Sequence, residues 1–397
     1  MTPLERVREA IQSRLQYRPD DAAIIDCMVS VVVAAHHPQI TEPVWLYFVG
    51  PAGTGKTEPV RTLRGYSHVQ MIDELTENSL MSGYTTEEGL DPSLLPSLNG
   101  GVLVIKDFTT ILDLPSQKRD KIIAVLRASY DGFVAKSGGA AGLREYTVSF
   151  GVIACVTDVI DKFLEECQTL GERFLLFRLQ RASLSMEERL GDGRKAVVKG
   201  AAGKPAWRAS MAAEVREGMD KAKQMCLEIP TPQFDVEGHR DIMQLANVLA
   251  LLRTSPYRGA TTKAESPSRI AQQFVCLGWA HMIADCREEW GETEDTLVRR
   301  IALDSLEDRR KRIIRSMYLR GKSRPGTNLE YLCKNSHIDH PQLMPLLRQL
   351  CFVKAMEVSE GEEEYAMDGK RRKSRGTASY RLTESTYDSI EESRLFT

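Results

Sequence analysis

The chain has 397 residues, of which 42% are hydrophobic and 27% are charged, and its formal net charge is -2. This length is too great for one ordinary domain, so we expect two or three. The composition is typical of a folded protein with a sizeable core and excludes a disordered chain. Because the charges balance, any contact with nucleic acid must come from a local basic patch.

Eight cysteines are scattered along the chain and none forms a CxxC pair, so we expect no zinc site. The first ten residues are charged from Glu5 onward and do not resemble a signal peptide. The longest apolar run near the N-terminus, residues 28–35, is too short to cross a bilayer. We therefore expect a reduced, cytoplasmic protein with no membrane partner.

The patterns along the chain predict four segments. Residues 1–40 place apolar side chains at helical spacing and form an N-terminal helical segment. Residues 41–190 alternate apolar strands with helices, which predicts an α/β core with a mostly parallel sheet. Residues 191–295 begin as a Gly-, Ala- and Lys-rich linker and continue as a helical lid. Residues 296–397 have a pattern of their own and form a compact C-terminal unit.

A glycine-rich segment, GPAGTGKT over residues 50–57, follows an apolar strand at 44–49 and matches G-x-x-x-x-G-K-[ST]. Glycines allow backbone N–H groups to turn toward phosphates, and a following helix adds its positive end. Lys56 would reach the β- and γ-phosphates, and the Thr57 hydroxyl would bind Mg²⁺. The motif predicts a P-loop NTPase that uses ATP and Mg²⁺, whereas a glycine-rich turn with an exposed lysine is the alternative. The predicted nucleotide-binding residues are Gly50, Pro51, Ala52, Gly53, Thr54, Gly55, Lys56 and Thr57.

An apolar run over residues 101–106 ends in Asp107, which is the Walker B arrangement of a strand that delivers a carboxylate to Mg²⁺. Many related ATPases have a glutamate directly after this aspartate, and here the next residue is Phe108. The catalytic base must therefore come from elsewhere, or be absent.

Glu74 is the substitute that the sequence offers. It follows a short strand at 68–72, and parallel strands end at the same edge of a sheet. RecA-like ATPases place their catalytic glutamate in a similar way. Our hypothesis is that Glu74 orients the attacking water while Asp107 holds the metal. The alternative is that Asp73 and Glu74 cap the following helix.

Residues 125–158 resemble a segment of AAA+ ATPases, in NtrC-type activators and MCM-type helicases, where a helix leads into a hairpin and then a strand. The resemblance implies a hairpin over 132–145 that projects into a central pore, with Lys136 and Arg144 contacting DNA. It also implies that the next strand, 148–156, delivers Thr157 or Asp158 as the sensor 1 residue beside the γ-phosphate. An ordinary surface hairpin is the alternative.

Arginine positions extend the AAA+ resemblance. The segment LGERFLLFRL resembles those that present an arginine finger to the neighbouring subunit's nucleotide, and it implies Arg173 first and Arg178 second. A guanidinium offers permanent charge and planar donors to a developing phosphoryl oxyanion. Both arginines have the alternative of a solvated or ion-paired role. Arg269, near the start of a predicted lid helix, corresponds to sensor 2. The resemblance covers about residues 44–290, but the GAFTGA loop of transcription activators is missing.

The residue pattern of the C-terminal unit predicts three helices, at 305–321, 328–335 and 340–351, followed by strands at 352–358 and 379–382. This order resembles a winged helix, in which the third helix enters the DNA major groove and the wing touches phosphates. The implied DNA-binding residues are Arg348 on the third helix and Lys370, Arg371, Arg372 and Lys373 in the wing. Winged helices also dock proteins, and glutamates beside the wing cluster reduce its positive field.

Together these patterns predict an oligomeric ATP-hydrolysing motor or switch of the AAA+ class that acts on DNA. A hexamer of helicase or loader type, as in phage or mobile-element replication, is the form that the arginine finger implies. The alternative is a protein-remodelling or defence-signalling ATPase whose winged helix binds a protein. A nucleotide switch without turnover is a third interpretation, since Phe108 replaces the usual glutamate.

Overall fold

The computed structural model describes most of the chain: residues 1–88, 90–137, 142–166, 173–180, 187, 190–191, 204–228, 239–254, 266–322, 326–359 and 378–396. The chain divides into two compact units. The first comprises Met1–Phe234 and Gln272–Ile301, and the second comprises Asp235–Ala271 and Ala302–Thr397.

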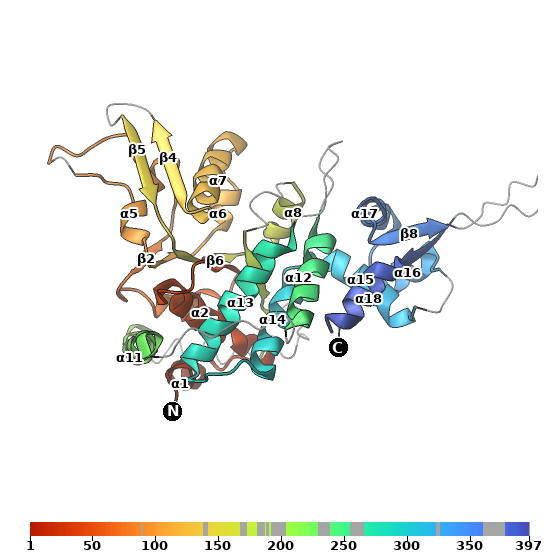
Figure 1. The fold of residues 1–397 in the computed structure, drawn as a ribbon, viewed down its shortest axis with the longest axis horizontal. Coiled ribbons are helices and arrows are strands. Elements are labelled where there is room, and N and C mark those ends of the chain that lie inside the picture. Colours follow the sequence, from red (N-terminus) through yellow and green to blue (C-terminus); the bar gives the residue numbers. More distant parts are fainter. Residues whose placement is uncertain are drawn as a thin grey trace, which may run out of the picture. The chain divides into compact units, whose positions relative to one another are not determined.

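A five-stranded parallel sheet forms the centre of the first unit (Figure 1). Its strands, in spatial order, are β2 (Val69–Ile72), β3 (Val102–Ile105), β6 (Gly151–Val156), β1 (Trp45–Val49) and β7 (Leu175–Arg178). Every residue of β1, β3 and β6 is buried, as expected for a parallel sheet covered on both faces. The α/β prediction is therefore confirmed.

Aromatic side chains make up much of the core on one face of this sheet. Tyr47 of β1 stacks on Phe174 with ring centroids 3.9 Å apart, and Phe108 meets Tyr47 edge-on at 5.0 Å. Trp45 donates from Nε1 to the carbonyl of Phe150 over 2.8 Å, so its one polar atom is satisfied inside the core. Each of these rings is essentially inaccessible to solvent. Burying such a ring contributes on the order of 2–3 kcal/mol.

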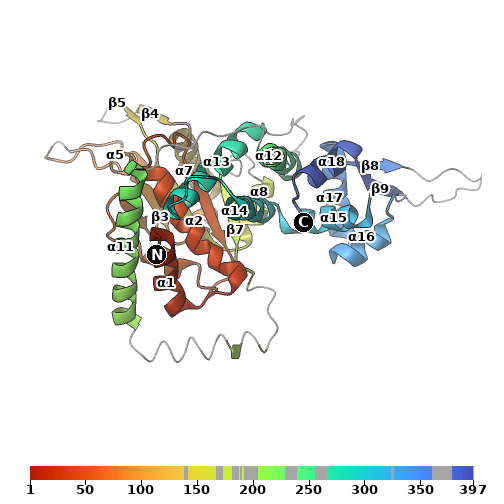
Figure 2. The same cartoon turned by 60° about the horizontal axis from the view of Figure 1, so that its bottom comes forward.

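Two N-terminal helices, α1 (Pro3–Leu15) and α2 (Pro19–His36), precede the sheet and confirm the helical prediction for this part of the chain. A capping box between Thr2 and Glu5 begins α1. Helix α2 is apolar on nearly all sides because it packs between the sheet and its neighbouring helices. Helix α11 (Lys204–Glu228) lies along α1 (Figure 2).

The helices between the strands are short, apart from one. They are α3 (Thr57–Arg61), α4 (Glu77–Leu80), α5 (Leu95–Leu98), α6 (Thr109–Leu112), α7 (Ser116–Tyr130) and α8 (Val159–Glu166). Helix α7 leads into an antiparallel hairpin made by β4 (Phe133–Ser137) and β5 (Leu143–Thr147). Gly132 takes φ +86° where helix turns into strand, a conformation that favours glycine. The predicted hairpin therefore exists, and it precedes β6.

Helices α13 (Pro267–Ala284) and α14 (Glu292–Asp304) run from one unit into the other. Within the first unit a buried ionic cluster joins them. His281 Nδ1 lies 2.7 Å from Glu294 Oε1, and Arg287 donates to the same carboxylate. Glu294 is fully buried, and these hydrogen bonds offset the cost of burying its charge.

The second unit is helical with one small antiparallel sheet. Its elements are α12 (Arg240–Arg253), α15 (Asp308–Arg320), α16 (Leu329–Ser336), α17 (His340–Phe352), β8 (Met356–Ser359), β9 (Ser379–Leu382) and α18 (Glu384–Glu392). The predicted order of three helices and two strands, α15 to β9, is thus confirmed. Buried Arg310 donates to the carbonyls of Leu252 and Thr254, so α15 satisfies the end of α12.

Among the residues that the structure describes, no helix combines the length and the apolar character needed to cross a membrane.

Candidate functional site

The glycine-rich loop connects β1 to α3 at the carboxyl edge of the sheet. Gly53 and Gly55 take φ values of +80° and +90°, which favour glycine. A Cβ at Gly50 would come within 3.1 Å of Thr54 Oγ1. Lys56 is only 9% exposed, and its Nζ donates to the Pro51 carbonyl over 3.2 Å. The loop therefore curls around the ammonium of its own lysine.

Strand order decides which side chains accompany this loop. Strand β6 lies between β1 and β3, so Thr157 at the end of β6 lies between the loop and Asp107 at the end of β3. Neighbouring strands are about 4.8 Å apart, which places β3 roughly 10 Å from β1. Asp107 is exposed at this edge, and Thr157 is half-buried.

Thr109 joins Asp107 to Thr157, although no motif of the sequence indicated this residue. Its backbone N–H donates to Asp107 Oδ1 over 3.1 Å, and its hydroxyl lies 3.3 Å from the Thr157 hydroxyl. The Thr157 amide donates to the same Thr109 oxygen over 3.3 Å. An aspartate followed two residues later by threonine is a common turn pattern, which is the only signal that the sequence carried.

Phe108 does not join Asp107, Thr109 and Thr157 at the sheet edge. Its side chain is fully buried against Tyr47, and its backbone N–H donates to the Cys155 carbonyl over 2.7 Å. Position 108 therefore belongs to the core, and a carboxylate there would face apolar side chains rather than the sheet edge.

Glu74 is exposed at the end of β2, the edge strand next to β3. Ile72 pairs with Ile105, so Glu74 follows β2 about level with Asp107. The three strand spacings from β2 to β1 amount to roughly 14 Å. Thr76 caps α4, so the alternative that Asp73 and Glu74 cap this helix is wrong. Asp73 instead forms an ion pair with Lys106 at 2.6 Å.

Both candidate finger arginines form ion pairs inside the protomer. Arg173 has a side chain that is 8% exposed, and it donates to both carboxylate oxygens of Asp131, over 3.0 and 2.8 Å. Arg178 donates to both oxygens of Asp161, over 3.0 and 2.5 Å. Arg178 also pairs in register with Val49, so it lies beside the loop of its own chain.

Lys136 and Arg144 are cross-strand partners in the hairpin, and both face the preceding segment of the chain. Lys136 Nζ donates to Asn78 Oδ1 over 3.0 Å and to the Met81 carbonyl over 3.1 Å. Arg144 donates to the Tyr84 carbonyl over 2.8 Å and also pairs with Asp91. These two basic residues therefore hold residues 78–91 against the hairpin.

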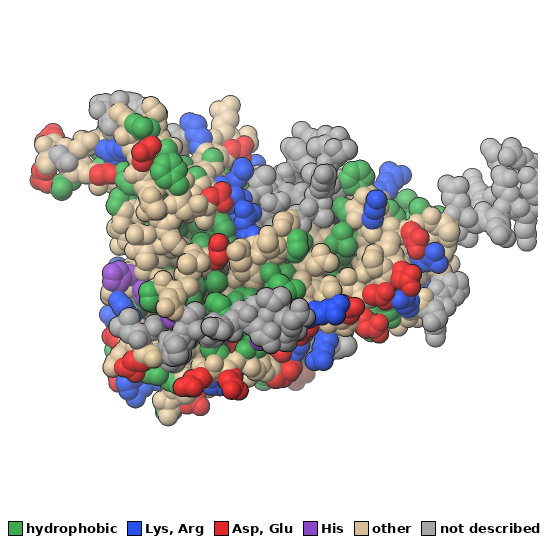
Figure 3. All heavy atoms as spheres, viewed as in Figure 1, with side chains coloured by type: hydrophobic (Ala, Val, Ile, Leu, Met, Phe, Trp, Pro, Cys, Tyr) green, Lys and Arg blue, Asp and Glu red, His purple; other side chains and the backbone are tan. Residues whose placement is uncertain are grey.

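The opposite face of the hairpin is mixed: Ser137, Glu145 and Thr147 are exposed on it beside three apolar side chains. Phe133 is 52% exposed and Leu143 is 63% exposed, and Ala135 between them is also exposed. Hydrophobic side chains reach the surface at this end of the first unit (Figure 3). The turn residues 138–141 lie outside the described part of the chain.

Three further predictions fall in the C-terminal half. Arg269 is half-buried in the first turn of α13 and belongs to the second unit. Arg348 is exposed on α17. The wing cluster Lys370, Arg371, Arg372 and Lys373 lies outside the described residues.

Two residues that no sequence motif indicated also form hydrogen bonds at the sheet edge near the loop. Arg300 of α14 donates to the Arg178 carbonyl over 2.8 Å, and its guanidinium lies 5.2 Å from the Phe177 ring centroid. Cys155 of β6 donates from Sγ to the Lys56 carbonyl at 3.6 Å. Burial raises the pKa of the Cys155 thiol to about 12, so it stays protonated and can donate.

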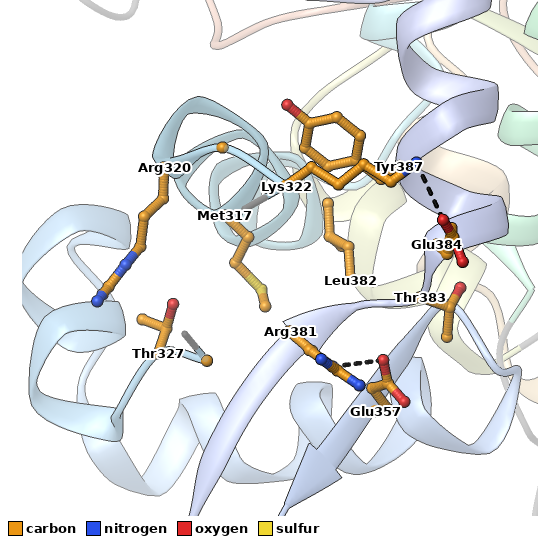
Figure 4. Close-up of a pocket in the computed structure, with 12 residues that line it drawn as sticks. Met317, Arg320, Lys322, Thr327, Glu357, Arg381, Leu382, Thr383, Glu384 and Tyr387 are labelled. Carbon is orange, nitrogen blue, oxygen red and sulfur yellow. Dashed lines mark hydrogen bonds and ion pairs between the residues drawn. The ribbon is translucent and has the colours of Figure 1, made fainter. Parts of the chain in front are cut away.

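A separate cavity of about 470 Å³ lies in the second unit between the end of α15, β9 and the start of α18 (Figure 4). Four of its charged side chains form ion pairs, and the guanidinium of a fifth, Arg320, lies over the Tyr331 ring. Arg381 faces Glu357 at 2.6 Å, and Lys322 lies between Glu384 and Asp388. The hydrogen bond to Asp388 raises the pKa of Lys322. The lining carries the three cations Arg320, Lys322 and Arg381 and the two anions Glu357 and Glu384, so one positive charge is in excess.

In the described part of the chain no three His, Cys, Asp or Glu side chains converge as a ready-made metal site. A search of protein-family models and of curated protein sequences matches nothing to this chain.

Proposed function

We propose that the chain is an ATPase of the AAA+ class whose glycine-rich loop binds the phosphates of ATP. The observation that carries this proposal is the position of Lys56 inside a loop at the same sheet edge as Asp107 and Thr157. A loop motif alone can arise by chance, but a strand-delivered acid and a polar sensor beside it are a second, independent requirement.

The residues of the loop fit a triphosphate. Positive φ at Gly53 and Gly55 allows consecutive amides to converge, and Lys56 supplies the positive charge. Helix α3 has only five residues, so the amides of the loop carry more of the binding than a helix dipole. Mg²⁺ keeps several waters and takes one or two protein ligands beside phosphates, which agrees with Thr57 as a direct ligand and Asp107 as an acid that would hold the ion through water.

The strand order supports membership of the AAA+ class. An AAA+ core has its sensor 1 strand between the strand of the phosphate-binding loop and that of the metal-binding acid, as β6 lies between β1 and β3. The hairpin before β6 agrees with the pre-sensor-1 group. In this scheme Asp107 holds the metal through water, Thr157 contacts the γ-phosphate, and Glu74 orients the attacking water.

We further propose that ATP hydrolysis drives or switches an oligomer on DNA. The order α15, α16, α17, β8, β9 supports a winged helix, with Arg348 exposed on its third helix. Arg173 or Arg178 would complete the site of a neighbouring subunit, and Arg269 would act as sensor 2. A hexamer of helicase or loader type is the assembly that this chemistry implies.

A second candidate function is protein remodelling, and the hairpin favours it. The face of the hairpin that is open to solvent carries Phe133 and Leu143, whereas Lys136 and Arg144 face residues 78–91. This face also carries Glu145 and no Lys or Arg. A polypeptide is therefore a better partner for it than a DNA backbone, which needs cations.

One experiment tests these proposals together. ATP turnover is measured alone, with single-stranded DNA and with duplex DNA, over a series of salt concentrations. Stimulation by DNA that fades with salt supports the DNA motor, because phosphate contacts release counterions. Turnover that ignores DNA supports the protein remodeller, and nucleotide binding without turnover supports a switch.

Lys56→Ala is the variant that tests the site itself. It should weaken binding of Mg²⁺-ATP by about 10- to 100-fold, because a charge-assisted contact to phosphate is lost. Lys118→Ala, an exposed lysine of α7, is the matched control and should bind like the parent. Equal binding by both variants would rule out the loop as the phosphate site.

A further inference from the structure

The phosphate-binding loop is held from outside by a side chain of the N-terminal helical segment. Tyr17 lies in the connection between α1 and α2, and its hydroxyl donates to the Gly55 carbonyl over 2.6 Å. Tyr17 is only 7% exposed and Gly55 is half-buried, so this hydrogen bond is partly shielded from water. The two residues are 38 positions apart in the sequence.

The position of Tyr17 is itself determined by α1. Gln16 takes a left-handed conformation, with φ 51°, where α1 ends. The Gln12 side chain then brackets Tyr17: its Oε1 accepts from the Tyr17 amide over 2.7 Å, and its Nε2 donates to the Tyr17 carbonyl over 3.3 Å. The main chain of Tyr17 is therefore held at both polar groups, and its phenol is directed at the loop.

The contact determines how one peptide group of the loop is turned. In a trans peptide the C=O and the following N–H point in opposite directions, so a Gly55 carbonyl directed at Tyr17 turns the Lys56 amide the other way. Gly55, at φ +90°, has no Cβ to restrict this peptide. The Glu58 amide, at 3.2 Å, occupies a second acceptor position of the same carbonyl. Tyr17 and Glu58 thus share the task of orienting it.

We propose that Tyr17 is a positioning residue of the nucleotide site, through which α1 and α2 set the affinity of the loop for the phosphates. The inference rests on the proposed function of this loop. The chemical basis is preorganisation: an amide already turned toward the phosphate loses less entropy when the nucleotide binds. Without the hydroxyl, the Gly55–Lys56 peptide samples orientations that do not bind.

The test compares Tyr17→Phe with the parent in the full-length chain. The probe is a fluorescent ATP or ADP analogue with Mg²⁺, and KM and kcat for ATP are measured alongside. We expect about fivefold weaker binding and a similar rise in KM, because one neutral hydrogen bond is lost. We expect kcat to stay near that of the parent, because the loop contacts are the same in the ground and transition states.

Two controls separate positioning from general damage. Tyr380→Phe removes the hydroxyl of another buried tyrosine, in the second unit, and should leave the affinity unchanged. Gln12→Ala keeps the Tyr17 hydroxyl but releases the Tyr17 backbone. It should weaken binding by about twofold, which is about half of the change in binding free energy expected for Tyr17→Phe. A merely destabilised enzyme would instead lose active fraction, which lowers kcat rather than raising KM.

The outcomes are distinguishable. If the parent binds nucleotide and Tyr17→Phe and Gln12→Ala bind it equally well, the positioning role is wrong and the proposed function stands. If the parent binds no nucleotide, the proposed function and this inference both fail.

Discussion

Arg173 donates to both carboxylate oxygens of Asp131, over 3.0 and 2.8 Å, and so joins the segment that leads into β7 to the turn between α7 and the hairpin. The guanidinium also lies 5.8 Å from the Tyr130 ring centroid. An arginine that acts on the nucleotide of a neighbouring subunit must leave this pair. The pair therefore connects the base of the hairpin to the proposed contact between subunits.

Arg173→Ala should keep ATP binding and stop hydrolysis if Arg173 completes a neighbour's site, with a loss in kcat of about 10³-fold. Asp131→Asn should have the opposite effect and raise turnover at low protein concentration, because the arginine is released. The measurement is ATPase rate against protein concentration for both variants. Full turnover by Arg173→Ala would show that this arginine has only the structural role that its ion pair indicates.

Glu74→Gln should retain nucleotide affinity and lower kcat by about 100-fold or more, because a base that orients the attacking water is lost. Asp73→Asn is the matched control: it changes the neighbouring carboxylate, which already pairs with Lys106, and should retain turnover. Single-turnover hydrolysis of radiolabelled ATP measures both. If Asp73→Asn loses turnover and Glu74→Gln does not, the assignment of the base is reversed.

Arg144→Ala should release the segment at 84–91 from the hairpin, because the Tyr84 carbonyl and Asp91 lose their shared donor. We expect faster proteolytic cleavage within this segment, by roughly tenfold for a local loss of about 1.4 kcal/mol. Arg381→Ala, which breaks an exposed ion pair with Glu357 in the second unit, is the control and should not change cleavage there. Equal cleavage of parent and Arg144→Ala would contradict this role.

The stability of the first unit should depend on pH through His36. Burial, with smaller contributions from Lys223 and His68, lowers the pKa of His36 from 6.5 to about 4. The unfolded chain therefore binds a proton between these pH values while the folded chain does not, so stability rises with pH from about 4 to 6.5. As the pH falls from 6.5 to about 4, the free energy of unfolding therefore decreases, in total by the order of 2–3 kcal/mol.

His36→Gln should flatten this dependence and make the protein more stable than the parent at pH 5. The Nε2 of His36 is buried, and no hydrogen bond reaches it from the described residues. Replacing the imidazole therefore breaks no hydrogen bond of Nε2 within this part of the chain. Urea unfolding at pH 5 and pH 7.5 measures the difference. His340→Gln, which changes an exposed histidine, should keep the slope of the parent. An unchanged slope in His36→Gln would assign the pH dependence to other groups.

Local patterns in the sequence were enough to predict helices and strands that the structure contains. The apolar run before Gly50 predicted β1, and the helix pattern after Asn328 predicted α16. Such patterns succeed because each strand or helix buries a face that the residue spacing reveals. The hairpin after α7 was predicted from resemblance rather than from spacing. That Lys136 and Arg144 are cross-strand partners was not predicted and is a finding of the structure.

Contacts between distant residues were beyond the sequence. Nothing local indicates that Thr109 joins Asp107 to Thr157, that Tyr17 reaches Gly55, or that Asp131 holds Arg173. A charged or hydroxyl side chain has the same local signature whether it is solvated, paired or directed at a ligand.

The sequence by itself determined the glycine-rich GPAGTGKT motif, the elements that flank it and the acids that end two other strands. Only the tertiary structure decided which strand lies between Asp107 and the loop, that Phe108 belongs to the core, and which arginines form ion pairs inside the protomer. The reason is that spacing along a chain specifies which face a side chain occupies, whereas its partner is set by which elements pack together.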